Sequence, residues 1–212
     1  MKSAKKIKIG GENKYTYDDY CTWPIDQRFE LIDGTVYDMT PAPSSNHQII
    51  VVELVRQLAN FFHGKTCKVF VAPFDVRFPE KNERDEEIKN VVQPDVVVIC
   101  DPQKLDEKGC RGAPDLVIEV ISPSTASKDH LKKKRLFECH GVKEYWLIDP
   151  QYELATIYRQ SSKGLFNLAA TLGRDETLEC PLFESLKINF SSVFPPPPPK
   201  TVKESTRKFS KS

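Results

Sequence analysis

The sequence contains no apolar run that approaches the ~20 residues needed to cross a bilayer. Its first residues also lack the apolar stretch of a secretory signal, which favours the cytoplasm as its compartment. Neither a Ser-His-Asp order nor a glycine-rich phosphate loop stands out. The absence of these features disfavours a membrane-spanning or secreted protein, a hydrolase with a catalytic triad, and a nucleotide-binding enzyme with a phosphate loop.

The six cysteines contain no pair with the spacing of a zinc knuckle. Three of them, Cys67, Cys100 and Cys139, lie in or beside segments that look like core. Together with the expected compartment, this pattern predicts reduced cysteines.

A large net charge is also missing, because the total is +1. Residues 1–8 carry +4 and residues 200–212 carry +4, which leaves −7 for the stretch between them. An acidic body with basic ends differs from a general nucleic-acid coat. Any contact with DNA must then use a local patch or the ends of the chain.

The 212 residues are enough for one domain with a sizeable core. We expect a basic extension over 1–14, a domain over 15–194, and a disordered, proline-rich basic tail over 195–212. Hydrophobic periodicity and turn residues predict the elements of this domain in the following order. They are a short helix at 15–23 with Thr16 as its cap, a hairpin at 29–39 turning at Asp33-Gly34, a helix from 45 to Gly64, strands at 68–78, 93–100 and 115–122, a helix from 124 or 125 to about 140, a strand at 144–148, and two or three antiparallel strands around 153–159, 164–172 and 185–190.

Residues 79–90 form a charged loop in this scheme. The middle of the chain therefore has the order helix, three strands, helix, strand. That order predicts an α/β (α+β mixed sheet) fold with helices on the faces of the sheet.

Glu119 interrupts residues 116–121, which otherwise look like a strand buried on both faces. A lone carboxylate there costs several kcal/mol unless a metal ion or a base compensates it. Asp95 opens the preceding strand, and neighbouring strands lie only ~4.8 Å apart, so both acids could hold one cation. Asp115 is on the same strand as Glu119, roughly 13 Å away, and is interpreted as a strand-start residue. The alternative is that Asp95 and Glu119 are paired structural acids.

Carboxylate oxygens suit Mg²⁺ or Mn²⁺ better than Zn²⁺. Lys133 is the expected cationic partner, because it lies three and four residues before the apolar Leu136 and Phe137. Its neighbours Lys132 and Lys134 are rotated by about 90–110° from that direction. Lys133 could then stabilise charge on a phosphoryl group or position water, with Asp129 orienting it. The alternative is a lysine whose stem covers the edge of the core.

These residues resemble the PD-(D/E)XK nuclease superfamily. The core of that superfamily has the order helix–strand–strand–strand–helix–strand, with an Asp on the second strand and an acid-x-Lys motif on the third. Asp95 and Glu119 match the acids, but Ile121 stands where the resemblance calls for lysine. The resemblance implies that Lys133, on the following helix, supplies the ammonium group instead.

More narrowly, the chain resembles the Uma family of restriction-endonuclease-like proteins over roughly 15–194. The matching segments are FELIDG at 29–34, PAPSxxHQ at 41–48, QPD at 93–95, DLVIEVxSPS at 115–124 and GVKEYWxxDP at 141–150. The resemblance implies a restriction-endonuclease-like core of order αβββαβ, with an N-terminal hairpin and extra C-terminal antiparallel strands.

The same motifs nominate two further site residues. Glu30 is either a third acid of the site or a salt-bridge partner. His47, in the first turn of its helix, is either a contact to phosphate or to water around the metal, or a surface residue beside a cap. Asp75, expected on the first core strand, is a weaker candidate of the same kind.

The leading hypothesis is a Mg²⁺-dependent DNA endonuclease in which Asp95 and Glu119 hold the metal, Lys133 assists water and Glu30 supports the site. Cutting both strands needs two centres, so a homodimer is a further expectation. The alternative is a catalytically inactive nuclease-fold protein that binds DNA or a protein partner, which Ile121 and the acidic body favour. A third reading is a toxin- or mobile-element-associated factor that docks through residues 195–212.

Overall fold

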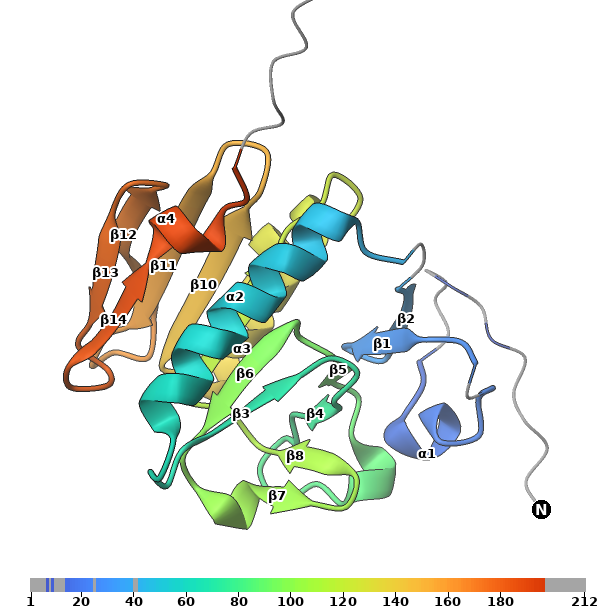
Figure 1. Ribbon diagram of the computed structural model, residues 1–212. Coiled ribbons are helices and arrows are strands. Elements are labelled where there is room, and N and C mark those ends of the chain that lie inside the picture. The colour runs from blue at the N-terminus through green and yellow to red at the C-terminus, as the bar shows by residue number, and fades with distance from the viewer. Residues whose placement is uncertain (1–6, 8, 10–13, 25, 40–41, 197–212) are drawn as a thin grey trace, which may run out of the picture.

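The computed structural model describes residues 7, 9, 14–24, 26–39 and 42–196. In this part of the chain, a six-stranded mixed sheet with the order β12-β11-β10-β9-β6-β3 forms the centre of the fold (Figure 1). β10 runs parallel to β9, while β6 and β3 are antiparallel to their neighbours. The strands are β3 (Lys68–Val71), β6 (Val96–Ile99), β9 (Leu116–Val120), β10 (Glu144–Asp149), β11 (Leu154–Gln160) and β12 (Phe166–Gly173).

A helix covers each face of this sheet (Figure 1). On one side lies α2 (Ser45–Phe62). On the other lies a continuous helix that passes through a π-helix, η3 (Lys128–Lys133), and continues as α3 (Lys134–His140) to Gly141, whose φ of 84° ends it. The order α2, β3, β6, β9, α3, β10 confirms the predicted αβββαβ core and the mixed α+β class.

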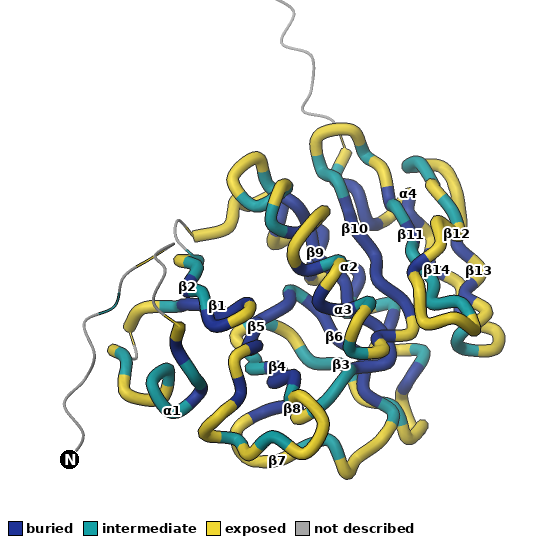
Figure 2. Tube along the Cα trace, turned by 180° about the vertical axis from the view of Figure 1, so that it is seen from behind, coloured by how far each residue is buried: buried dark blue, intermediate teal, exposed yellow. Residues whose placement is uncertain are grey.

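The central strands β6, β9 and β10 are buried on both faces, as Figure 2 shows by their dark colour. Their side chains alternate between two apolar clusters. Ile118 and Val120 pack in the cluster that contains α2, whereas Val117 and Ile121 pack in the cluster that contains α3. Glu119 therefore points to the α3 side.

A second sheet, ordered β2-β1-β5-β4-β8-β7, lies beside the first. The predicted hairpin is confirmed, because Asp33 and Gly34 adopt positive φ angles of 50° and 72° between its strands. The other strands were predicted only in part, since most are two residues long and too short to show a period. The bounds are β1 (Phe29–Ile32), β2 (Thr35–Asp38), β4 (Val76–Arg77), β5 (Val91–Val92), β7 (Leu105–Asp106) and β8 (Gly109–Arg111).

Two predicted core strands are wrong in their extent. The strand predicted for 68–78 splits, because the chain leaves β3 after Val71 and re-enters the second sheet as β4. Of residues 93–100, only Val96–Ile99 form a strand, since Gln93 to Asp95 carry the chain from β5 to β6. Asp75 consequently lies between β3 and β4 rather than on a core strand.

The helix ends also differ slightly from the prediction. α2 begins at Ser45 as predicted but ends at Phe62, and Ser44 caps it, since its hydroxyl accepts a hydrogen bond from the His47 amide at 3.2 Å. α1 is shorter than predicted but starts after Thr16 as expected. The short helices are α1 (Tyr17–Tyr20), η1 (Asp85–Glu87), η2 (Pro102–Lys104) and α4 (Phe190–Val193).

The expectation of reduced cysteines is wrong for Cys67 and Cys100, which form a disulfide. The antiparallel register that pairs Lys68 with Ile99 sets these two cysteines opposite each other at the next step. Their separation of 33 residues along the chain gave no sign of this pairing. The remaining cysteines are free: Cys21, Cys110, Cys139 and Cys180.

Residues 177–193 pack on the α2 side of the main sheet. The strands predicted around 153–159 and 164–172 are β11 and β12, and that around 185–190 is β14 (Leu186–Asn189). β14 pairs with a strand that was not predicted, β13 (Thr177–Cys180). Residues 197–212, which include nearly all of the predicted tail, and most of the predicted extension over 1–14 lie outside the described residues. None of the described helices has the length and apolar character needed to cross a membrane.

Candidate active site

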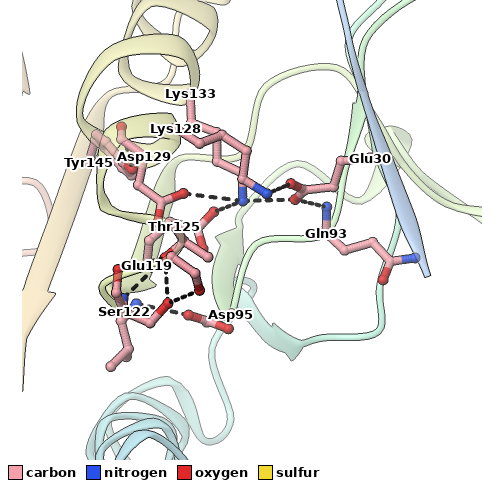
Figure 3. A network of polar contacts seen from close by, with 12 residues as sticks. Glu30, Gln93, Asp95, Glu119, Ser122, Thr125, Lys128, Asp129, Lys133 and Tyr145 are labelled. Carbon is pink, nitrogen blue, oxygen red and sulfur yellow. Dashed lines mark hydrogen bonds and ion pairs between the residues drawn. The ribbon is translucent and has the colours of Figure 1, made fainter. Parts of the chain in front are cut away.

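The two predicted metal ligands lie on neighbouring segments, Glu119 on β9 and Asp95 directly before β6. β6 and β9 pair with Val96 opposite Ile118, and one further step along this register sets Asp95 opposite Glu119. Asp95 is held at this position, because its Oδ2 accepts a hydrogen bond from the Val120 amide at 2.8 Å. Figure 3 shows both carboxylates in the same polar network.

Lys133 reaches this network from the helix above the sheet, and only 2% of its surface is exposed. Its Nζ lies 2.6 Å from Glu119 Oε1, 2.7 Å from Glu30 Oε1 and 3.7 Å from Asp129 Oδ1 (Figure 3). The adjacent lysines point elsewhere, as helical phase predicted. Lys132 contacts the Tyr37 hydroxyl and Lys134 lies over the ring of Tyr158.

Glu30 is fully buried on β1, and its side chain points into the same network. Besides Lys133, it accepts hydrogen bonds from Lys128 Nζ at 2.7 Å and from the Gln93 amide at 3.1 Å. Lys128 was not predicted as a site residue. In a π-helix the hydrogen bonds run from i to i+5, so Lys128 and Lys133, five residues apart, can both face the sheet.

Burial and neighbouring charges shift the pKa values of the residues in this cluster in different directions. Burial raises the pKa of Glu119 well above its usual value; Lys133 opposes this shift, whereas Asp129 and Asp95 add to it. Burial also disfavours the Glu30 carboxylate, but Lys133 and Lys128 outweigh it and lower the pKa of Glu30 to about 2. The surrounding acids likewise outweigh burial and raise the pKa of Lys133. Lys133 is therefore charged, Glu30 is ionised, and Glu119 is a group that readily holds a proton.

The Glu30→Gln variant should lose about 3 kcal/mol of unfolding free energy at neutral pH, because it removes the anion between two buried ammonium groups. A folded-state pKa of about 2, below the usual 4.5, means that this stabilisation exists above the usual pKa and fades as the pH falls towards 2. Urea unfolding from about pH 7 to about pH 3 should show the gap between variant and wild type closing. A gap independent of pH would contradict the ionised state assigned to Glu30.

His47 lies beside Asp95, with 3.1 Å between His47 Nε2 and Asp95 Oδ2. The cap formed by Ser44 sets the first turn of α2 so that the imidazole reaches across to the start of β6. His47 and the Val120 amide together fix one oxygen of Asp95. His47 is thus placed to orient this carboxylate.

The other two acids considered in the sequence analysis lie elsewhere. Asp75 accepts hydrogen bonds from the Tyr20 hydroxyl and from Gln93 Nε2, and it is not among the described residues that line the cleft. Asp115 accepts from the Cys100 amide and from Lys143 Nζ, which fits a structural strand-start residue.

A cleft of about 770 Å³ opens onto this cluster. Its size is within the range of sites that bind small molecules or parts of larger ligands. Asp95, Glu119 and Lys133 all line it, although Glu119 and Lys133 are almost fully buried. The wall also includes His47, Lys128, Asp129 and the hydroxyl residues Ser122, Ser124 and Thr125.

Asp95 and Glu119, the pair expected to share a cation, face each other in the register of β6 and β9, and both line the cleft. Among the residues that the structure describes, no set of three or more His, Cys, Asp or Glu side chains is arranged to hold a metal ion. Two carboxylates are nevertheless sufficient for Mg²⁺, which keeps several waters and takes further ligands from phosphate. Asp129 Oδ1 is buried and has no hydrogen-bond partner within the described chain, and Lys133 Nζ at 3.7 Å is its ion-pair contact.

Comparison with known proteins identifies the family of the chain. The Uma2 family model, described as "putative restriction endonuclease", matches residues 17–191. The chain belongs to the Uma2 family. An uncharacterized protein of Synechocystis sp. is 29% identical over 154 residues, which cover 71% of this chain and 77% of that protein.

A solved structure shares the fold of this Uma2 member. It is a crystal structure from Anabaena variabilis, described as a putative nuclease belonging to DUF820, and it matches with a TM-score of 0.65 at 22% identity. The match covers 84% of this chain and 97% of the other. It supports the nuclease-like fold that the resemblance implied.

Proposed function

We propose that this Uma2 protein is a Mg²⁺- or Mn²⁺-dependent endonuclease that hydrolyses phosphodiester bonds in DNA. The observation that carries the proposal is the contact between Lys133 and Glu119 at the wall of a cleft, with Asp95 directly before the neighbouring strand β6. The description of the family model, "putative restriction endonuclease", supports DNA as the substrate class.

The charges of the cluster fit a divalent cation. If all of its acids ionise, two negative charges remain uncompensated, because four carboxylates face two ammonium groups: Asp95, Glu119, Glu30 and Asp129 against Lys128 and Lys133. Asp95 and Glu119 would hold the ion. When bound, such an ion supplies Lewis-acid polarisation of a phosphoryl oxygen and lowers the pKa of water.

Lys133 acts in this proposal as a charged hydrogen-bond donor. Since its pKa is raised, it cannot serve as the base that accepts a proton from water. Its ammonium group would instead orient water or stabilise the negative charge that develops on the phosphoryl oxygens. Glu30 keeps Lys133 in place at 2.7 Å and is in turn fixed by Lys128 and the Gln93 amide.

A cleavage assay tests the proposal. Supercoiled plasmid and linear duplex DNA are incubated with the protein in Mg²⁺ or Mn²⁺, and the wild type should nick or cut them. Asp95→Asn should lower the rate by more than the ~10–100-fold typical of changes outside the ligand set. Asp101→Asn is the matched control, because Asp101 is exposed and caps η2, a role that Asn also fills. DNA binding by the wild type without cleavage under either cation would instead support the inactive, DNA-binding alternative.

Cation binding should release a proton. The raised pKa of Glu119 means that a bound cation must displace the proton this carboxyl tends to hold, so affinity should rise with pH. Calorimetric titration of Mn²⁺ in two buffers with different ionisation enthalpies measures the proton directly. Equal heats in both buffers, with an affinity that does not change with pH, would contradict Glu119 as a ligand.

The proposal includes a homodimer, because cutting both strands of a duplex needs two centres. Light scattering on the purified protein, with and without duplex DNA, measures its oligomeric state.

A further inference from the structure

A smaller cavity of about 280 Å³ adjoins the cleft. Arg28, Pro43 and Asp95 line both cavities, so the smaller cavity lies next to the predicted metal ligand Asp95. The rest of its wall is mainly aliphatic, with a single amide: Val51, Val52, Val55, Val71, Ala72 and Gln48. A volume slightly below the ~300 Å³ typical of the smallest ligand sites suits one compact, flat group.

Part of this aliphatic wall is open to solvent. Val52 on α2 is 64% exposed and Val71 at the end of β3 is 44% exposed. Two exposed valines from different elements, in a cavity that shares Asp95 with the cleft, form an apolar surface continuous with the cleft.

Arg28 stands at the boundary between the two cavities and is held there by a chain of hydrogen bonds. Its Nε donates to Gln93 Oε1 at 2.9 Å, and Gln93 Nε2 donates to Asp75 Oδ1 at 2.8 Å. The Tyr20 hydroxyl also donates to Asp75, at 2.9 Å. Arg28 Nη2 is buried and has no hydrogen-bond partner among the described residues. An arginine fixed in this way has donor capacity left for an anion.

We propose that the smaller cavity binds an unstacked nucleobase of the DNA strand that is cleaved. The scissile phosphate of this strand would lie at Asp95 and Glu119, and Arg28 would bind a backbone phosphate between the scissile phosphate and the bound base. This inference rests on the proposed function. The valines would cover the faces of the base and the Gln48 amide would meet its polar edge. A base inside a duplex is stacked on both sides, so the ligand is a single-stranded or an extrahelical nucleotide.

The test measures binding rather than cleavage. Fluorescence anisotropy follows a labelled single-stranded oligonucleotide, in EDTA to prevent cutting, and a series of oligonucleotides moves one abasic site along the strand. The variants are Val52→Gln, which places a polar chain in the cavity, and Ile49→Gln as matched control. Ile49 is on the same helix and 48% exposed, and it lines neither cavity. A parallel arm uses duplex DNA with and without one mismatched position, which distinguishes an extrahelical base from a single strand.

In the wild type and in Ile49→Gln, one abasic position should weaken binding by about tenfold, the scale of one lost base contact. In Val52→Gln the intact strand should bind about as weakly as the abasic one, so the positional effect disappears. The inference is overturned if the position of the abasic site does not affect the binding affinity of the wild type. It is also overturned if the affinity depends on this position in the same way in Val52→Gln and Ile49→Gln. The proposed function fails separately, through absence of cleavage in Mg²⁺ and Mn²⁺, so the two failures can be told apart.

Discussion

The Glu119→Gln variant should lose cation binding and DNA cleavage without losing stability. The raised pKa of Glu119 means that the folded protein favours the protonated form of this side chain, and a neutral amide resembles that form in size and shape. An acid whose folded pKa is raised is least favourable to the fold at high pH. The variant should therefore be as stable as the wild type at about pH 5 and equally or more stable at about pH 8.

In contrast to its stability, the nuclease activity of the Glu119→Gln variant should fall. An amide oxygen is a far weaker ligand for Mg²⁺ than a carboxylate, so cleavage should fall by more than ~100-fold. Calorimetry with Mn²⁺, a cleavage assay and urea unfolding on the same preparations measure all three properties.

Glu144→Gln is the contrasting variant. Glu144 is equally buried in the same sheet, but it lies at the far end of β10, opposite Leu116, and accepts hydrogen bonds from Arg159 at 2.6 Å and Trp146 at 2.9 Å. Its replacement should cost about 1–3 kcal/mol of unfolding free energy and leave cation affinity unchanged. Equal destabilisation by both substitutions would show that Glu119 is an ordinary structural acid.

The Lys133→Met variant should show the largest loss of stability. Methionine fills a similar volume but leaves Glu119, Glu30 and Asp129 without their shared ammonium group, and breaking a buried ion pair costs about 3–5 kcal/mol. The loss should be smaller at about pH 5 than at about pH 7, since the abandoned carboxyls can take up protons. DNA cleavage should disappear as well.

Lys132→Met is the control, because its side chain contacts Tyr37 at the surface. It should change the unfolding free energy by less than about 0.5 kcal/mol. Circular dichroism and urea unfolding measure both variants. If Lys133→Met folds with wild-type stability, the buried network does not have the charges assigned to it.

The parts of the site that could be predicted from the sequence depend on regular periods. Alternation along a strand and lateral spacing between strands place Asp95 opposite Glu119, and the observed register agrees. The helical period separates Lys133 from Lys132 and Lys134 because Leu136 and Phe137 mark the apolar face. The core order followed from the lengths and types of successive segments.

The parts that could not be predicted depend on irregular backbone or on contacts distant in sequence. Lys128 shares Glu30 with Lys133 only because the helix passes through a π-helical segment, and no residue pattern marks that segment in advance. The role of Gln93 depends on a break between β5 and β6 that the apolar run concealed. The direction of Glu30 was undecided, because its strand is buried on both faces and its neighbours show no alternation.

The central claim is that Asp95 and Glu119 hold one cation beneath Lys133. Crystals grown with Mn²⁺ and a non-cleavable oligonucleotide, measured at the manganese absorption edge, test it most directly. The account predicts an anomalous peak within coordination distance of both carboxylates, ~2.0–2.3 Å from an oxygen of each. A peak bound to other residues, or none at a Mn²⁺ concentration that supports cleavage, would contradict it.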